Sequence, residues 1–295
     1  MAFVTWVGGR NVVIQNGQAG EEFDAVSWPL ALSDDGRIVA YQSRRDGFQF
    51  CVVGKERSRP YRSVGLPVIS ADGSVVTFAA SNDDGWRVVR NGQEGPHFDW
   101  VGNLVLHSSG RQLAYTAECR EAGVLKSFVV FNDTPGDFFD RVTQPVLSRD
   151  GNVVAYGGLK AGRWHLVVGR QEVPVDGEIT RVFLSPDGSR SAYVLDAGPC
   201  RRLIGPSGAG PVFDWIGEAA FERDGRITYL AARSNRKFLV VDHHEIGLGR
   251  YEVSDLVLTA DGRQAGFSAR ADRSLYWKAI GLPPPGEPVA KEDNP

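Results

Sequence analysis

The stretch Val146–Gly169 reads VLSRDGNVVAYGGLKAGRWHLVVG and contains most of one repeating unit. A short apolar run enters a Ser-x-Asp-Gly turn, a run rich in β-branched and aromatic residues follows, and a polar loop leads to a third apolar run. Short runs of this kind, bounded by Gly, Asp and Asn, are typical of β-strands joined by tight turns. The stretch therefore predicts consecutive antiparallel strands.

The same unit recurs along the chain of 295 residues. Its turn is found seven times, and the turn glycines are Gly36, Gly73, Gly110, Gly151, Gly188, Gly225 and Gly262. Their spacing is 37 residues, except for 41 residues between Gly110 and Gly151. Each unit also has a fourth short run, which often ends in Phe-Asp, and no window shows a sustained helical period. We expect four antiparallel strands per unit, named A to D in chain order.

A repeated four-stranded unit of about 40 residues is the signature of a β-propeller blade, because one small sheet cannot bury both of its faces alone. The Ser-x-Asp-Gly turn, the Ala-Tyr pair of strand B and the Trp-x-Val-Val pattern of strand C resemble the TolB-type, WD-like β-propeller repeat family of bacteria. The resemblance covers nearly the whole chain. It implies an all-β fold in a single domain, 1–295, and no common active site.

The register of the repeat predicts eight blades, and seven is the alternative. Residues 1–26 supply strands B, C and D of a blade that lacks strand A, and residues 286–295 are a candidate for that missing strand or a tail. Pairing of the two ends would close the ring. With seven blades, residues 1–17 would be a redundant flap.

The sequence Gly-Pro-x-Phe-Asp-Trp-x-Gly occurs twice, at 95–102 and 210–217, where strand D crosses to the next blade. We expect the aromatic residue to pack between neighbouring blades and the aspartate to accept backbone N–H groups. A ring of carboxylates that binds a cation or a basic partner is the alternative.

Composition and motifs exclude several function classes. The net charge of −3 gives no general attraction to nucleic acid, and no apolar run approaches the ~20 residues that span a bilayer. No signal peptide is visible, which favours the cytoplasm, or the periplasm if a leader has been removed. The three cysteines are widely spaced and are expected to be buried. No nucleophile elbow, phosphate loop or zinc motif is present, so we expect no catalytic residue, cofactor or metal.

The loops between strands B and C are rich in arginine and share one face with the crossovers from D to A. Arginine and tryptophan are typical anchors of protein interfaces. The candidate partner-binding residues are Arg44, Arg45, Trp100, Trp215, Arg233, Arg236, Arg270 and Arg273. The sequence thus favours a monomeric, non-enzymatic scaffold for a protein or peptide. The alternative is an enzyme or a carbohydrate- or small-molecule-binding protein that uses the central channel.

Overall fold

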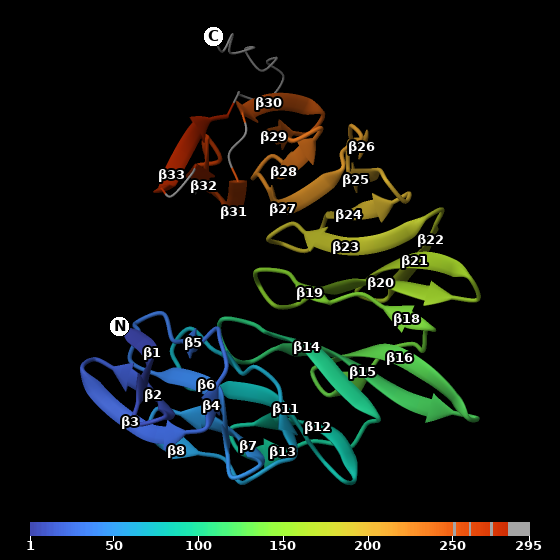
Figure 1. Ribbon diagram of the computed structural model, residues 1–295. Coiled ribbons are helices and arrows are strands. Elements are labelled where there is room, and N and C mark those ends of the chain that lie inside the picture. The colour runs from blue at the N-terminus through green and yellow to red at the C-terminus, as the bar shows by residue number, and fades with distance from the viewer. Residues whose placement is uncertain (250–251, 260, 272–273, 283–295) are drawn as a thin grey trace. The chain divides into compact units, whose positions relative to one another are not determined.

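The computed structural model describes residues 1–249, 252–259, 261–271 and 274–282, and every regular element within them is a β-strand. The expected all-β fold is confirmed (Figure 1). The chain divides into two compact units, Met1–Pro145 and Val146–Pro295. None of the described residues lies in a helix that could span a membrane.

The first unit contains four antiparallel sheets, whose strands follow one another in chain order. The first sheet consists of β1 (Ala2–Val7), β2 (Arg10–Gln15) and β3 (Gln18–Phe23). The second consists of β4 (Ala25–Val26), β5 (Ala31–Leu32), β6 (Val39–Arg45), β7 (Phe48–Val53) and β8 (Glu56–Arg57). The third consists of β9 (Ser63–Val64), β10 (Val68–Ile69), β11 (Val76–Asn82), β12 (Gly85–Arg90) and β13 (Gln93–Glu94). The fourth consists of β14 (Trp100–Leu106), β15 (Leu113–Glu121), β16 (Val124–Phe131) and β17 (Thr134–Pro135), and β18 (Arg141–Val142) follows it.

The second unit continues the series. The fifth sheet contains β19 (Val146–Leu147), β20 (Val154–Lys160), β21 (Arg163–Val168) and β22 (Gln171–Val175). The sixth contains β23 (Glu178–Leu184), β24 (Ser191–Asp196), β25 (Arg201–Gly205) and β26 (Gly208–Ala209). The seventh contains β27 (Trp215–Phe221), β28 (Ile227–Arg233), β29 (Arg236–Val241) and β30 (His244–Gly249). The eighth contains β31 (Glu252–Leu258), β32 (Gln264–Ala271) and β33 (Ser274–Gly281).

This sequential strand order is that of a propeller blade, with A, B, C and D side by side. The first sheet has the three strands expected from residues 1–26, and its β1 and β2 pair as B and C. The expected closing strand at 286–295 lies outside the described residues.

Strand A is irregular in every described sheet that has one, and two forms of irregularity recur. In the second and third sheets, strand A is divided into two short segments, with Pro29 and Pro67 between them. The ladder is interrupted there because proline cannot donate a backbone hydrogen bond. In the fourth, sixth, seventh and eighth sheets, strand A is continuous but its pairing with strand B shifts at a bulge.

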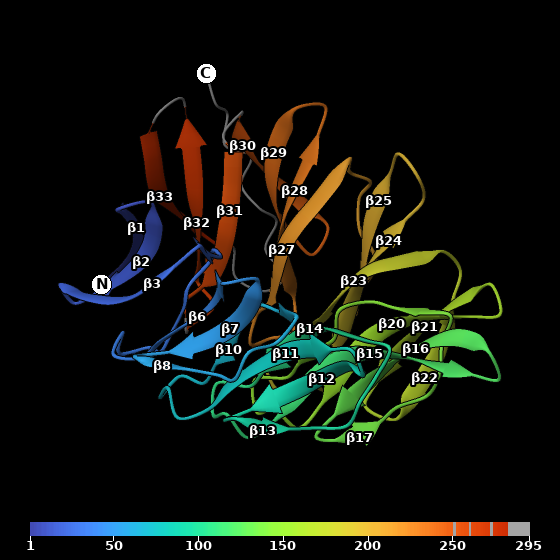
Figure 2. The ribbon, with the colours of Figure 1, turned by 60° about the horizontal axis from the view of Figure 1, so that its bottom comes forward.

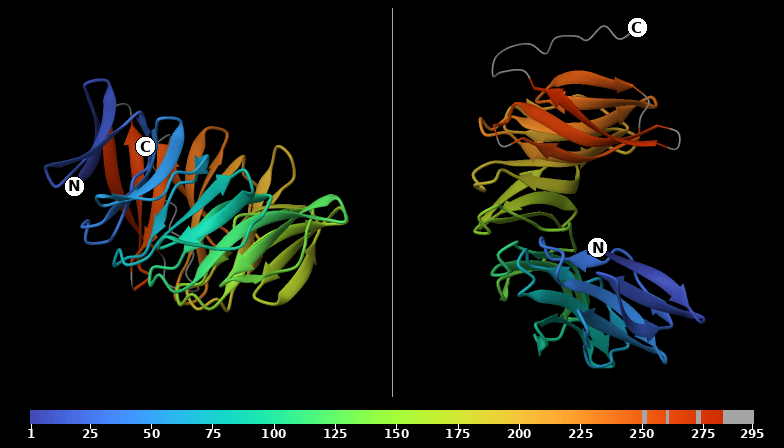
Figure 3. Two further views of the ribbon diagram at one scale, coloured as in Figure 1. Left: turned by 90° about the horizontal axis from the view of Figure 1, so that it is seen from below. Right: turned by 90° about the vertical axis from the view of Figure 1, so that its left-hand side faces the viewer.

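Successive sheets pack face to face within each unit (Figures 2 and 3). In the first unit, Val39 and Tyr41 of the second sheet pack against Phe23, and Cys51 packs with Phe78 of the third sheet. In the second unit, the sixth and seventh sheets share a core that contains Leu203 and Tyr229. Each sheet therefore buries its apolar side chains against its neighbours, as blades do.

The Ser-x-Asp-Gly turns between strands A and B are held by a repeated set of hydrogen bonds. In the second sheet, Ser33 Oγ donates to Asp35 Oδ1 at 2.7 Å, and the Ile38 N–H donates to Ser33 Oγ at 3.0 Å. The Ser33 hydroxyl and the Arg37 N–H lower the pKa of Asp35. In the fourth sheet His107 takes the place of the serine, and its Nδ1 lies 2.8 Å from Ser109 Oγ.

The turns also contact one another from sheet to sheet. The Asp34 N–H donates to the Ala71 carbonyl at 2.8 Å, and the Ala71 N–H donates to the Ser108 carbonyl at 2.8 Å. Gly110 has a φ of +71°, and a Cβ there would lie 2.7 Å from Val75 Cγ2 of the preceding sheet. Glycine is thus required at this position both for its conformation and for the close approach.

Candidate functional site

Backbone hydrogen bonds place the crossover from strand D to strand A beside the B–C hairpin in the second, fourth and seventh sheets. The Asp24 N–H donates to Arg44 O at 2.8 Å, the Asp99 N–H to Glu118 O at 2.9 Å, and the Asp214 N–H to Ala232 O at 2.9 Å. We call this end of a sheet, with its crossover and B–C hairpin, the hairpin end. The opposite end, with the A–B and C–D turns, is the turn end.

The phenylalanine of the repeated Phe-Asp pair contacts two neighbouring sheets. Phe213 exchanges two backbone hydrogen bonds with Arg201 of β25, at 2.7 and 3.0 Å. Its ring is fully buried and packs edge-on against Tyr229 of the next sheet, with centroids 6.2 Å apart. Phe23 and Tyr41 form the same pair at 6.2 Å. The expected packing of this aromatic residue between neighbouring sheets is confirmed.

The aspartate of the Phe-Asp pair bonds to groups of the adjacent B–C hairpin in the second and seventh sheets. Asp24 Oδ2 accepts the Asp46 N–H at 2.9 Å, and Asp214 Oδ2 accepts the Ser234 N–H at 2.8 Å. Asp140 instead binds Lys126 Nζ at 2.6 Å. Among the residues that the structure describes, no group of three or more His, Cys, Asp or Glu side chains is placed to hold a metal ion. The geometry therefore favours turn stabilisation over a cation site.

We expect Asp214→Ala to lower the free energy of unfolding by about 1 kcal/mol, because it removes the bond to the Ser234 N–H. The side chain of Asp99 makes no such bond within the described part of the chain, so Asp99→Ala should stay within about 0.5 kcal/mol of the wild type. Urea denaturation of both variants checks this. Equal losses would contradict a role for the side-chain bond.

In the two copies of Gly-Pro-x-Phe-Asp-Trp-x-Gly, the tryptophan that follows the Phe-Asp pair lies over a glycine. Residues two apart on a strand share a face, and a side chain at Gly102 would overlap the indole of Trp100. Gly217 is related to Trp215 in the same way. The repeated Trp-x-Gly is therefore a packing motif that holds the ring flat against the backbone. Trp100 keeps 39% of its surface exposed.

The predicted arginines differ in their surroundings. Arg45 binds Glu21 Oε1 at 2.6 Å, and Arg233 is paired with both oxygens of Glu245, at 3.1 and 2.5 Å. Arg270 lies 3.7 Å from Glu252 Oε2. These ion pairs compensate the charges of Arg45, Arg233 and Arg270, which were predicted to bind a partner.

The other predicted positions are more open. Arg44 and Arg236 are exposed at the ends of β6 and β29, and no ion pair to either is found within the described residues. Arg233 and Arg236 face each other across one hairpin, whereas Arg44 belongs to the other unit. Arg273 lies outside the described residues.

A charged network near the second and third sheets was not foreseen from the sequence. Glu94 accepts hydrogen bonds from Tyr61 Oη at 2.7 Å, Arg59 Nε at 2.5 Å and Arg87 Nη1 at 2.9 Å. Arg87 is only 4% exposed and also pairs with Asp84. Burial raises the pKa of Glu94, but the three donors outweigh it and bring the pKa from its ordinary 4.5 to about 2.

The lowered pKa gives the network a defined pH dependence. A carboxylate with a depressed pKa stabilises the fold above its unfolded value and loses this contribution as pH falls toward the folded value. We expect Glu94→Gln to cost about 2 kcal/mol at pH 7, because charge-assisted hydrogen bonds are lost. The difference from the wild type should shrink between pH 4.5 and pH 2. Urea denaturation at pH 7 and pH 3 measures it, and a constant difference would contradict the assignment.

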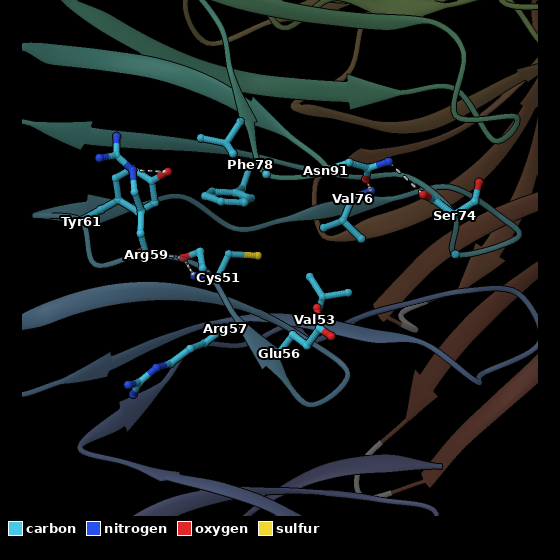
Figure 4. A pocket seen from close by; sticks show the side chains of 14 residues that line it. Cys51, Val53, Glu56, Arg57, Arg59, Tyr61, Ser74, Val76, Phe78 and Asn91 are labelled. Carbon is cyan, nitrogen blue, oxygen red and sulfur yellow. Dashed lines mark hydrogen bonds between the residues drawn. The ribbon is translucent and has the colours of Figure 1, made fainter.

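A cavity of about 460 Å³ lies between the second and third sheets (Figure 4). Its apolar wall includes Val53, Val76, Phe78 and Val89, and Cys51 adds a thiol whose pKa burial raises to about 12. Polar groups line the rest of the cavity and include Glu56, Arg57, Ser58, Arg59, Ser74 and Asn91. Arg57 and Arg59 bind Glu21 and Glu94, respectively, so their charges are already compensated.

The cysteines show how burial varies along the repeat. Cys51 is buried as expected, Cys119 is half-buried, and Cys200 is exposed. The expectation of three buried thiols was therefore wrong for Cys200, because it lies in the long B–C loop between β24 and β25 and not within a strand.

Comparison with known proteins is informative for the fold. No family model and no curated protein matches the sequence. A solved structure of a eukaryotic initiation factor is 10% identical with a TM-score of 0.58, covering 95% of this chain and 82% of that chain.

Two solved β-propeller domains also match. The domain of the trilobed protease from Pyrococcus furiosus is 13% identical, with a TM-score of 0.43, and the match covers 89% of this chain and 99% of that one. The domain of Cps50 from Myceliophteria thermophila is 13% identical, with a TM-score of 0.42, and the match covers 88% and 99%.

Proposed function

We propose that this chain is a non-enzymatic interaction scaffold that binds a protein or peptide at the hairpin ends of its sheets. The observation that carries the proposal is the exposure of Trp100, Arg44 and Arg236 at these ends. Tryptophan and arginine are the side chains that most often supply binding energy at protein interfaces. The scaffold we propose is a monomeric eight-bladed ring of the TolB type.

Loop chemistry supports this choice over the turn ends. The Ser-x-Asp-Gly side chains bond to their own turns, as in the Ser70–Asp72 pair at 2.6 Å, and have little capacity left for a partner. At the hairpin ends, exposed arginine side chains retain donors that can bind carboxylates in a bidentate manner. The hairpin ends thus combine open hydrogen-bonding groups with aromatic surface.

The test is a double charge reversal, Arg44→Glu with Arg236→Glu. The immobilised wild-type protein is used to capture partners from the native host, and a partner identified by mass spectrometry is then purified and titrated. We expect the double variant to bind that partner at least about tenfold more weakly, since charge reversal at an interface slows association and leaves like charges opposed.

The matched control is Lys55→Glu with Arg223→Glu, which makes the same charge change in the same two sheets at the turn ends. This control should bind as the wild type does. Equal binding by both double variants would contradict recognition through the hairpin ends.

A further inference from the structure

The two copies of the Phe-Asp-Trp motif differ in the contact that the tryptophan ring makes. In the seventh sheet, Lys237 Nζ lies 5.2 Å from the ring centroid of Trp215. The pairing register explains this contact, because Trp215 pairs with Ala232 and Ala232 pairs with Lys237, so the three residues form a row across β27, β28 and β29. A cation over an indole face is attracted by the ring quadrupole. The chain therefore supplies its own cation to Trp215.

The corresponding row in the fourth sheet is Trp100, Glu118 and Ser127, across β14, β15 and β16 (Figure 1). Ser127 stands where the seventh sheet has the lysine, and Glu118 stands where it has Ala232. No cation lies over Trp100 within the part of the chain that the structure describes. The row of the fourth sheet thus lacks the lysine of the seventh sheet and carries a carboxylate beside the ring.

The charges around this row favour an incoming cation. Glu118 Oε1 accepts one hydrogen bond, from Ser127 Oγ at 3.2 Å, which leaves acceptor capacity on the carboxylate. Asp99 directly precedes the tryptophan in the sequence. Burial raises the pKa of Cys119, and the negative charges of Asp99 and Glu121 raise it further. Of the nearby cations, Lys126 is bound to Asp140 at 2.6 Å and Arg120 is exposed on the hairpin. An indole with an adjacent carboxylate is a suitable receptor for an ammonium group.

We propose that Trp100 and Glu118 bind a lysine side chain of the protein partner, in the position that Lys237 occupies over Trp215. This inference rests on the proposed scaffold function and specifies the chemistry of its partner. The ammonium group lies over the exposed indole and donates to Glu118, while the ring is held flat by Gly102. The site is therefore preformed on one sheet.

The experiment uses Nα-acetyl-lysine methylamide as the probe and the indole N–H resonances of the ¹⁵N-labelled full chain as the readout. We expect the lysine probe to shift the Trp100 resonance, which is assigned by its loss in Trp100→Phe. The norleucine analogue has a similar alkyl chain without the ammonium group and should produce no comparable shift. The Trp215 resonance should respond less, because Lys237 already lies over that ring.

Two variants test the mechanism of binding. Glu118→Gln removes the carboxylate of the receptor and should weaken probe binding, read from the Trp100 resonance, about fivefold or more. Ser127→Lys restores the residue found in the other copy and should occupy the indole from within, which also weakens binding. Lys237→Ala is the matched control and should leave the Trp100 response unchanged. Melting curves establish that each variant is folded.

The outcomes separate the site from the scaffold function. A Trp100 shift that the lysine probe alone produces, and that Glu118→Gln and Ser127→Lys both weaken, supports the proposal. No shift at millimolar probe, or equal shifts with the norleucine analogue, overturns it. If the purified partner depends on Arg44 and Arg236 but not on Trp100 and Glu118, the scaffold function stands and the lysine site is wrong.

Discussion

Replacing Phe213 by alanine is expected to lower the free energy of unfolding by about 3–5 kcal/mol, the largest effect of any single change considered for this chain. The ring is fully buried, and it contacts Tyr229 edge-on and Phe238 at a centroid distance of 5.7 Å. The Arg233 guanidinium also lies 5.1 Å from its centroid. Truncation to alanine leaves a cavity between the sixth and seventh sheets, because the surrounding side chains cannot relax enough to fill it. Urea denaturation followed by circular dichroism measures the loss.

The matched control is Phe48→Ala. Phe48 begins β7 at a hairpin end and is 49% exposed, so its removal should cost less than about 1 kcal/mol. If the two alanine variants unfold at the same urea concentration, Phe213 does not anchor the sheets as its burial indicates.

The second large effect is expected for Gly110→Ala, at about 2–4 kcal/mol. One part is the strain of a Cβ at a φ of +71°, and the other is the overlap of that Cβ with Val75 and Ser70 of the preceding sheet. The melting temperature and the urea midpoint should both fall.

Gly36→Ala separates the two causes. Gly36 occupies the same position in its turn with a φ of +67°, but nothing lies within 4 Å of its Cβ position. Its substitution should therefore cost only about 1–2 kcal/mol of conformational strain. An equal cost for the two variants would show that the contact between neighbouring turns contributes nothing to stability.

Local patterns account for what could be predicted from the sequence. The spacing of the turn glycines located the strands, because each tight turn needs a residue such as Gly151 with a positive φ. The Phe-Asp pair was correctly interpreted as a contact between sheets, since an aromatic residue recurring at a crossover has few other partners. Likewise, His107 occupies the serine position of its turn and bonds within that turn.

Contacts that depend on pairing register could not be predicted in the same way. Glu94 lies 33 residues from Tyr61, and only the packing of the second sheet on the third brings their side chains together. The difference between Trp100 and Trp215 follows from residues 127 and 237, which lie two strands away from the rings. The sequence contains both residues, but identifying them as neighbours of the two rings requires the register between strands B and C.

The position of the buried phenylalanine has a consequence for how the polypeptide is made. Phe213 is bonded to the backbone of the sixth sheet, yet its ring is covered by Tyr229 of the seventh. During synthesis from the N-terminus, a sheet can form its ladder as soon as its own strands have emerged, but its last aromatic side chain stays in water until the following sheet is complete. The newly made sixth sheet therefore exposes an apolar side chain to solvent for the time needed to translate about one more repeat, which is a few seconds at ordinary elongation rates. Chaperone dependence should accordingly rise when translation pauses after a Phe-Asp pair has emerged from the ribosome and before the following sheet is complete.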